Sequence, residues 1–96
     1  MMVLITYDVD TISEDGNKRL RKVAKVCRDY GVRVQNSVFE CKLTDAQFLI
    51  LKNKIKNIIN EEVDNIRIYV LGNKSNHKIE VIGKQRAIDF DGELII

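Results

Sequence analysis

The sequence predicts an α+β fold in which two helices cover one face of a mainly antiparallel sheet. Three observations support this fold: several short segments alternate apolar and polar residues, two segments have helical apolar spacing, and the two kinds of segment follow each other in a regular order. The 96 residues predict a single domain over 1–96, with a core over about 1–83 and a C-terminal tail over 84–96. A domain this short buries only about two-thirds of its unfolded surface, so dimerisation would supplement its stability.

The N-terminal third is predicted to form a strand and then a helix. Met1–Val9 is a run of β-branched and apolar residues and predicts a buried strand. A turn over Thr11–Gly16 follows, in which either Thr11 or Ser13 caps the helix. Gly31 is predicted to end this helix as the glycine that follows its last residue. The helix is indicated by apolar residues with i, i+3, i+4, i+7 spacing, namely Leu20, Val23, Ala24, Cys27 and Tyr30.

The middle of the chain repeats the strand and helix pattern. Val32–Leu43 alternates like a strand, but its phase changes near Asn36–Ser37, which requires either a bulge or a tight turn. A second helix is predicted to begin at Thr44, with Gln47 as its capping-box partner. Its inner face is formed by Phe48, Leu51, Ile55, Ile58 and Ile59.

The C-terminal part contains two further strand patterns. These are Ile66–Leu71 and Lys78–Ile82, separated by a turn over Gly72–His77, and Ala87–Ile96 is predicted to be extended. With a turn at Asn36–Ser37 the order becomes βαββαβ with an extra C-terminal strand or strands, a ferredoxin-like arrangement. Right-handed crossovers place both helices on one face. Because the other face also carries apolar residues, we expect a homodimer whose C-terminal tail packs on the partner.

Composition excludes several classes of protein. Hydrophobic residues at 45% and charged residues at 31% are typical of a soluble globular protein, and no apolar run reaches the roughly 20 residues that span a bilayer. Met1–Asp10 lacks the basic and small-residue features of a signal peptide. We therefore expect a cytoplasmic protein with no membrane partner. Cys27 and Cys41, with His77 as the only other soft ligand, do not make up a zinc site, and we expect reduced thiols.

Basic residues gather in one segment of the chain, although the net charge is only +2. Two interpretations remain open: a face that binds nucleic-acid phosphates, and a solvated surface. Arg19, Lys22 and Arg33 are the preferred phosphate contacts because they lie in the densest basic segment and, in a ferredoxin-like arrangement, near Asp8's side of the sheet. That segment contains Lys18, Arg19, Arg21, Lys22, Lys25, Arg28 and Arg33, opposed within the stretch only by Asp29.

Five short segments of the chain are similar to a known family. They are Tyr7-Asp8-Val9, Arg19–Lys25, Arg33–Glu40, Arg67–Leu71 and Gly92–Ile96. The first, third and fourth resemble signatures of the CRISPR-associated protein 2 family, and the other two are similar to its short members in subtype I-C systems. The resemblance covers essentially the whole chain in the expected order. It implies a ferredoxin-like homodimer that acts as a metal-dependent endonuclease on RNA or DNA during spacer acquisition in antiviral defence. It also implies a larger CRISPR integrase protein as a partner.

The resemblance further implies that Asp8 is the catalytic residue and the metal ligand, with its two copies facing each other across the dimer axis. Magnesium is typically held by one or two carboxylates, with water and phosphate completing its coordination, so Asp8 and its symmetry mate would suffice. From the sequence alone, Asp8 could instead cap the turn that follows the strand. Asp10 would share its face only if the strand continued that far. Asn36 and Ser37 are candidates either for turn formation or for nucleic-acid contact.

Three other functions remain open at this point. The first is a non-catalytic adaptor that bridges the CRISPR integrase and duplex DNA, since nuclease activity is dispensable in some members of the family. The second is a toxin ribonuclease of the VapD type, with the same fold but no immune role. The third is a ferredoxin-like domain that binds a small ligand, which is disfavoured because the sequence contains no glycine-rich phosphate loop.

Overall fold

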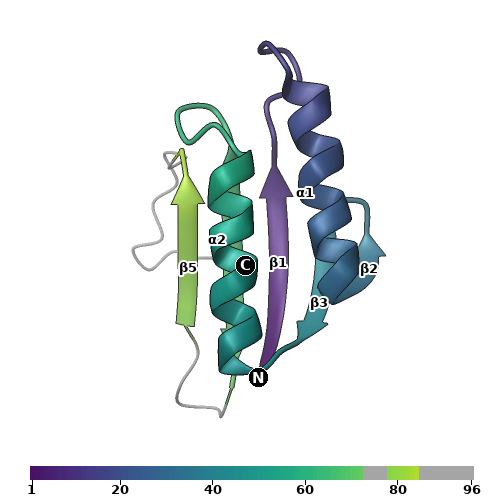
Figure 1. The fold of residues 1–96 in the computed structure, drawn as a ribbon, viewed down its shortest axis with the longest axis vertical. Coiled ribbons are helices and arrows are strands. Elements are labelled where there is room, and N and C mark those ends of the chain that lie inside the picture. Colours follow the sequence, from purple (N-terminus) through teal and green to yellow (C-terminus); the bar gives the residue numbers. More distant parts are fainter. Residues whose placement is uncertain (73–77, 85–96) are drawn as a thin grey trace, which may run out of the picture.

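The computed structural model describes residues 1–72 and 78–84. In these residues the elements follow in the order β1 (Met2–Asp8), α1 (Gly16–Tyr30), β2 (Gly31–Gln35), β3 (Val38–Lys42), α2 (Asp45–Ile58), β4 (Asn65–Leu71) and β5 (Lys78–Gly83) (Figure 1).

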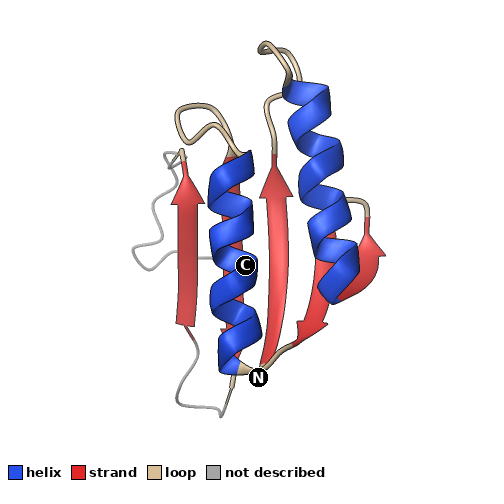
Figure 2. Ribbon diagram, viewed as in Figure 1, coloured by secondary structure: helices blue, strands red, loops and turns tan. Residues whose placement is uncertain are grey.

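The strands form one sheet in the order β2-β3-β1-β4-β5, and every pair of neighbours is antiparallel. Both helices lie on the same face of this sheet (Figure 2). In the central strand β1, Ile5 lies opposite Phe39 of β3 and Ile68 of β4. This arrangement confirms the predicted ferredoxin-like α+β fold with one strand added after the βαββαβ order.

Alternation along β1 separates a buried face from an open face. Val3, Ile5 and Tyr7 are buried toward the helices, where they join α1 and α2 side chains in one hydrophobic core. The residues between them belong to the other face of the sheet, which no helix of the described residues covers. Apolar side chains that remain exposed on this open face are Met2, Val32, Leu71 and Ile79.

The start of α1 differs from both predicted caps. Asp15 precedes the helix in the left-handed region at φ 63°, and its side chain makes no capping hydrogen bond. Ser13 Oγ instead donates to the Asp10 carbonyl oxygen, 3.0 Å away. The turn folds back so closely that a Cβ at Gly16 would lie 2.2 Å from that same oxygen. The prediction of Thr11 or Ser13 as the N-cap is therefore wrong. Asp15 is the residue before the helix, and the turn is closed by its tight packing against Gly16.

Gly31 ends α1 as predicted, but for another reason. Its φ of −162° is extended rather than left-handed, and it is already the first residue of β2. A Cβ on Gly31 would lie 2.4 Å from Cys41 Sγ and 2.3 Å from the Glu40 carbonyl oxygen. A glycine here allows β2 to approach β3 directly after the helix.

The change of strand phase near Asn36–Ser37 involves both a turn and an irregular pairing register. Asn36 and Ser37 form a turn between β2 and β3, and the pairing register also shifts between Arg33 and Gln35.

The helix α2 begins with the predicted capping box. Thr44 Oγ1 accepts from the Gln47 backbone N–H at 3.1 Å, and the Gln47 side chain accepts from the Thr44 N–H at 2.9 Å.

Some predictions fall outside the described residues. These residues are 73–77, in the predicted turn with His77, and 85–96, the tail that was predicted to be extended and to pack on a partner. Neither α1 nor α2 is long and apolar enough to cross a membrane.

Candidate functional site

Asp8 lies at the end of β1, opposite Asn65 of β4. It is exposed, whereas the preceding Tyr7 is buried. Because consecutive strand residues point to opposite faces of the sheet, the Asp8 carboxylate belongs to the open face and the Tyr7 ring belongs to the helix face. The strand ends at Asp8, so Asp10 does not continue on its face.

An open cavity of about 380 Å³ adjoins Asp8. It is polar, and its wall includes Lys84, the residue directly after β5, which sequence reasoning missed. The complete lining is Asp8, Val9, Asp10, Thr11, Ile12, Val63 and Lys84. Within the described residues no group of three or more His, Cys, Asp or Glu side chains could hold a metal ion. One carboxylate and an open space are nevertheless compatible with Mg²⁺, which keeps several waters and takes substrate phosphate as a ligand.

The loop after Asp8 is held in place by a buried carboxylate. Asp64 has no exposed surface. Its Oδ1 accepts from the Asp10 backbone N–H at 2.9 Å, and its Oδ2 accepts from the Asn60 backbone N–H at 2.9 Å. Asp10 itself is used locally, because its Oδ1 accepts from the Ile12 N–H at 3.0 Å. These bonds tie the loop after β1 to the loop before β4.

Arg19 completes this cluster. Its Nε donates to Asp64 Oδ2 at 2.8 Å, and its terminal nitrogens donate to the Glu14 carbonyl oxygen at 2.7 Å and to Ser13 Oγ at 2.7 Å. Only 11% of the Arg19 side chain is exposed. The structure thus gives Arg19 a different role from the predicted phosphate contact: it pairs with a buried charge and closes the turn before α1.

The ionisation of Asp64 follows from these contacts. Burial raises its pKa, but the hydrogen bonds from Arg19 and from the backbone N–H groups of Asn60 and Asp10 outweigh burial, so the pKa lies below its ordinary value. Asp64 is therefore ionised at neutral pH and gives the Arg19 guanidinium a permanent partner.

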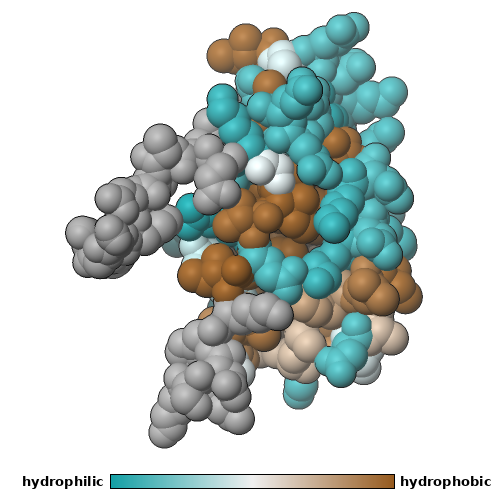
Figure 3. All heavy atoms as spheres, turned by 90° about the vertical axis from the view of Figure 1, so that its left-hand side faces the viewer, coloured by the Kyte–Doolittle hydropathy of each residue, from teal (hydrophilic) through white to brown (hydrophobic). Residues whose placement is uncertain are grey.

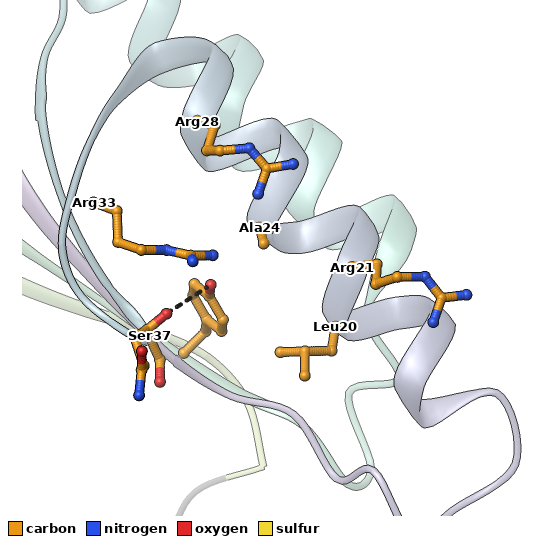
Figure 4. A pocket seen from close by; sticks show the side chains of 8 residues that line it. Leu20, Arg21, Ala24, Arg28, Arg33 and Ser37 are labelled. Atoms are coloured by element: carbon orange, nitrogen blue, oxygen red, sulfur yellow. Dashed lines mark hydrogen bonds between the residues drawn. The ribbon is translucent and has the colours of Figure 1, made fainter.

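A second cavity, of about 500 Å³, lies on the helix face between α1 and the turn that joins β2 to β3. We call it the arginine cavity; it is lined by Tyr7, Leu20, Arg21, Ala24, Arg28, Arg33, Asn36 and Ser37. In Figure 4, Arg33 extends toward Ala24, and Arg28 and Arg21 project from the α1 side. Arg21, Arg28 and Arg33 are all exposed.

Tyr7 connects this cavity to the core. Its ring stacks on Phe39 with centroids 6.0 Å apart, and its hydroxyl donates to the Asn36 carbonyl oxygen at 3.4 Å. The Arg33 guanidinium lies over the Phe39 ring, with its Cζ 5.3 Å from the ring centroid. Burial raises the Tyr7 pKa, against a smaller opposite effect of a hydrogen bond with Arg33. The hydroxyl is therefore protonated at neutral pH.

The structure places the predicted site residues at different locations. Arg33, Asn36 and Ser37 are brought together in the arginine cavity, whereas Asp8 lies on the other face of the sheet. Lys22 is exposed on α1 and does not line either cavity. Arg21 and Arg28 were named only as members of the basic segment. Their i, i+7 spacing indicates one shared helix face, but only the packing of α1 against the β2–β3 turn brings that face to this cavity.

Comparison with known proteins identifies the family. The profile described as CRISPR associated protein Cas2 matches residues 1–79. The chain is 55% identical to the CRISPR-associated endonuclease Cas2 of Halalkalibacterium halodurans, over 99% of each chain. It is 50% identical to the CRISPR-associated endoribonuclease Cas2 1 of Moorella thermoacetica, over 100% of each. The chain belongs to the Cas2 family.

Solved Cas2 structures agree with the fold. The crystal structure of Streptococcus pyogenes Cas2 at pH 6.5 superimposes with a TM-score of 0.70 at 58% identity, covering 77% of this chain and 89% of that one. A second structure, described as a crystal structure of cas2, has a TM-score of 0.65 at 32% identity and covers 100% of this chain and 98% of that one. All the predicted site residues of this Cas2 family member lie within the segment that the profile matches. The similarity to subtype I-C members stays a prediction.

The two thiols of this Cas2 family member are core groups rather than reactive ones. Cys27 and Cys41 are both free and buried. Burial, with a smaller effect of Cys41, raises the pKa of Cys27 to about 12, and burial also raises the pKa of Cys41. Both are therefore neutral thiols at physiological pH, and both are free cysteines, in agreement with the predicted reduced thiols.

Proposed function

We propose that this Cas2 family member is a cytoplasmic, metal-dependent endonuclease that hydrolyses phosphodiester bonds of RNA or DNA during CRISPR spacer acquisition. The observation that carries this proposal is the exposed Asp8 carboxylate at the end of β1, beside an open polar cavity. Two relatives support the same activity: one is named a CRISPR-associated endonuclease, at 55% identity, and the other a CRISPR-associated endoribonuclease, at 50%.

Asp8 is the residue that would hold the metal ion. When bound, Mg²⁺ would act as a Lewis acid toward the phosphate and would lower the pKa of a water molecule. Pairing of β1 with β4 fixes the backbone of Asp8 opposite Asn65, whose Nδ2 donates to the Lys84 carbonyl oxygen at 2.6 Å. Lys84 would add a positive charge at the rim of the same cavity and would help to orient a phosphate there.

The proposed enzyme is a homodimer formed through the open face of the sheet. Met2, Val32, Leu71 and Ile79 are exposed on this face, and a second copy would remove their apolar surface from water. Figure 3 shows the molecule from the β5 edge, where hydrophobic surface gathers across the middle of the view. A dimer of the kind that the family resemblance implies would bring the two copies of Asp8 together, supplying a second carboxylate for the metal.

A non-catalytic adaptor between nucleic acid and the larger CRISPR integrase is the second candidate. It is favoured by one observation: the arginine cavity lies on the opposite face of the sheet from Asp8. Binding of nucleic acid could then serve assembly without cleavage. Spacer acquisition in cells separates the two candidates. An adaptor keeps acquisition with Asp8→Asn and loses it with Arg33→Ala, whereas an enzyme whose cleavage matters loses it with both.

The proposed activity is tested by the metal dependence of cleavage. The purified protein is incubated with single-stranded RNA, single-stranded DNA and duplex DNA, in Mg²⁺ and after removal of divalent cations by a chelator. We expect at least one substrate to be cleaved in Mg²⁺, no cleavage after chelation, and recovery when Mg²⁺ is restored. Cleavage that continues unchanged in the chelator would contradict the proposal.

A further inference from the structure

We propose that Asp64 is a positioning residue for the Asp8 site. Asp64 has no exposed surface, so it touches neither a metal ion nor a substrate. Its role is to hold the walls of the cavity of about 380 Å³ beside Asp8, here called the Asp8 cavity, and thereby to set the affinity of Asp8 for a divalent cation. This role rests on the proposed function, in which Asp8 holds the metal ion.

Asp64 lies where the sheet ends beside Asp8. Asp8, Asn65 and Gly83 form the last cross-strand row at this end of the sheet. Here β1 and β5 end and β4 begins (Figure 1), and Asp64 is the residue directly before that row. Backbone beyond the row lies outside the strand pairing, so its position depends on other hydrogen bonds.

The hydrogen bonds of Asp64 reach every segment that lines the Asp8 cavity. Its Oδ1 accepts from the Asp10 N–H at 2.9 Å, in the loop after β1. Its carbonyl oxygen accepts from the Lys84 N–H at 2.6 Å, and its own N–H donates to the Asn60 carbonyl oxygen at 2.8 Å. The remaining lining residue, Val63, is its neighbour in the chain. Asp64 therefore joins the loop after β1, the loop before β4 and the residue after β5.

The Lys84 wall is fixed by a close approach of the backbone. Gly83 has φ 100°, and a Cβ on this residue would lie 2.2 Å from the Asp64 carbonyl oxygen. Only glycine allows the chain to turn back on Asp64 at this point. The Lys84 carbonyl oxygen is also held, because it accepts from Asn65 Nδ2 at 2.6 Å. Both backbone polar groups of Lys84 thus have partners at Asp64 and Asn65.

The Asp8 wall needs Asp64 for its position. The loop after β1 makes bonds of its own, from the Ile12 N–H to Asp10 Oδ1 and from Ser13 Oγ to the Asp10 carbonyl oxygen. These bonds fix the shape of the loop but do not connect it to β4. Asp64 makes that connection two residues after Asp8. A reacting group misplaced by about 1 Å can cost about a hundredfold in rate, so a single metal-binding carboxylate depends on this attachment.

The test is Mn²⁺ binding, measured from the electron paramagnetic resonance signal of the free ion, because Mn²⁺ prefers the same oxygen ligands as Mg²⁺. Asp64→Asn keeps the shape of the side chain but replaces one acceptor oxygen by a donor group. We expect its dissociation constant for Mn²⁺ to rise about tenfold. In cleavage, kcat should fall while KM for the nucleic acid stays constant, because Asp64 contacts no substrate.

Two further variants separate positioning from general stability. Ile55→Val removes a buried methylene group from α2, outside the Asp8 cavity, so it should lower stability and keep the wild-type affinity for Mn²⁺. Arg19→Lys is the milder second variant if Asp64→Asn does not fold. It keeps a cation beside Asp64 but loses bonds to Ser13 and Glu14, so it should bind Mn²⁺ more weakly than Ile55→Val.

Asp8→Asn distinguishes failure of this role from failure of the proposed function. If Asp8→Asn binds Mn²⁺ as tightly as the wild type, Asp8 holds no metal ion, and the proposed function and the role of Asp64 both fail. If Asp8→Asn loses Mn²⁺ binding while the folded Asp64→Asn and Arg19→Lys proteins bind like Ile55→Val, only the role of Asp64 is refuted.

Discussion

Arg19 Nε lies 2.8 Å from Asp64 Oδ2, and the Asp64 side chain has no exposed surface. The pair joins the start of α1 to the loop before β4, and through Asp64 it also holds the backbone of Asp10. The loop that follows the proposed metal ligand is thus positioned by a buried ion pair in addition to its own local hydrogen bonds.

Removal of either partner should destabilise the protein. Asp64→Ala leaves Arg19 and two backbone N–H groups without their acceptor, at a cost of about 3 kcal/mol. Arg19→Ala should also lower the denaturation midpoint, because it leaves a buried carboxylate unpaired. The measurement is urea denaturation followed by circular dichroism. Lys22→Ala, at an exposed position on the same helix, is the control; equal midpoints for the Arg19 and Lys22 variants would contradict the structural role of Arg19.

The same pair predicts how stability depends on pH. The pKa of Asp64 is lower in the folded protein than in the unfolded chain. The carboxylate therefore stabilises the fold fully at pH values above the unfolded-state pKa of about 3.9. This contribution is lost as the pH falls through the lower folded value. Between about pH 5 and about pH 2 the wild type should therefore lose more stability than Asp64→Asn. Parallel pH profiles of the denaturation midpoint would exclude this contribution.

The sequence predicted the fold because its signals are local. The alternation that buries Val3 and Ile5 and the capping box at Thr44 each depend on residues within a few positions of one another. The partner of Arg19 lies 45 residues away in the sequence, so no local pattern could separate a structural arginine from a phosphate-binding one. The faces of Arg21 and Arg28 likewise depend on how α1 packs on the sheet, which the helical period alone does not determine.

Dimerisation should depend on the open face of the sheet. Ile79 is 55% exposed there, beside Tyr69 of β4, and Ile79→Lys would place a charge in the proposed interface. We expect at least a tenfold weaker dimer in sedimentation, about 1.4 kcal/mol. Leu49→Lys, at a residue 58% exposed on α2, should leave the dimer intact. The proposed interface would be wrong if the two variants dimerise equally well.

The thiols should be unreactive in the folded protein. With a pKa of about 12, Cys27 is a thiolate in only about one molecule in 10⁴ at pH 8. Modification by a disulfide reagent should therefore be slow in buffer and fast in denaturant. Rapid modification of both cysteines without denaturant would show that the core around Cys27 and Cys41 opens easily.

The most direct test of the account is the cleavage rate of Asp8→Asn. Asparagine keeps the shape of the side chain but removes the charge that would hold Mg²⁺, so single-turnover cleavage should fall by about two orders of magnitude or more. Glu61→Gln removes one charge from an exposed carboxylate that lies outside the Asp8 cavity, and should cleave like the wild type. Equal rates for Asp8→Asn, Glu61→Gln and wild type, prepared in parallel and equally folded, would contradict the assignment of Asp8 as the catalytic metal ligand.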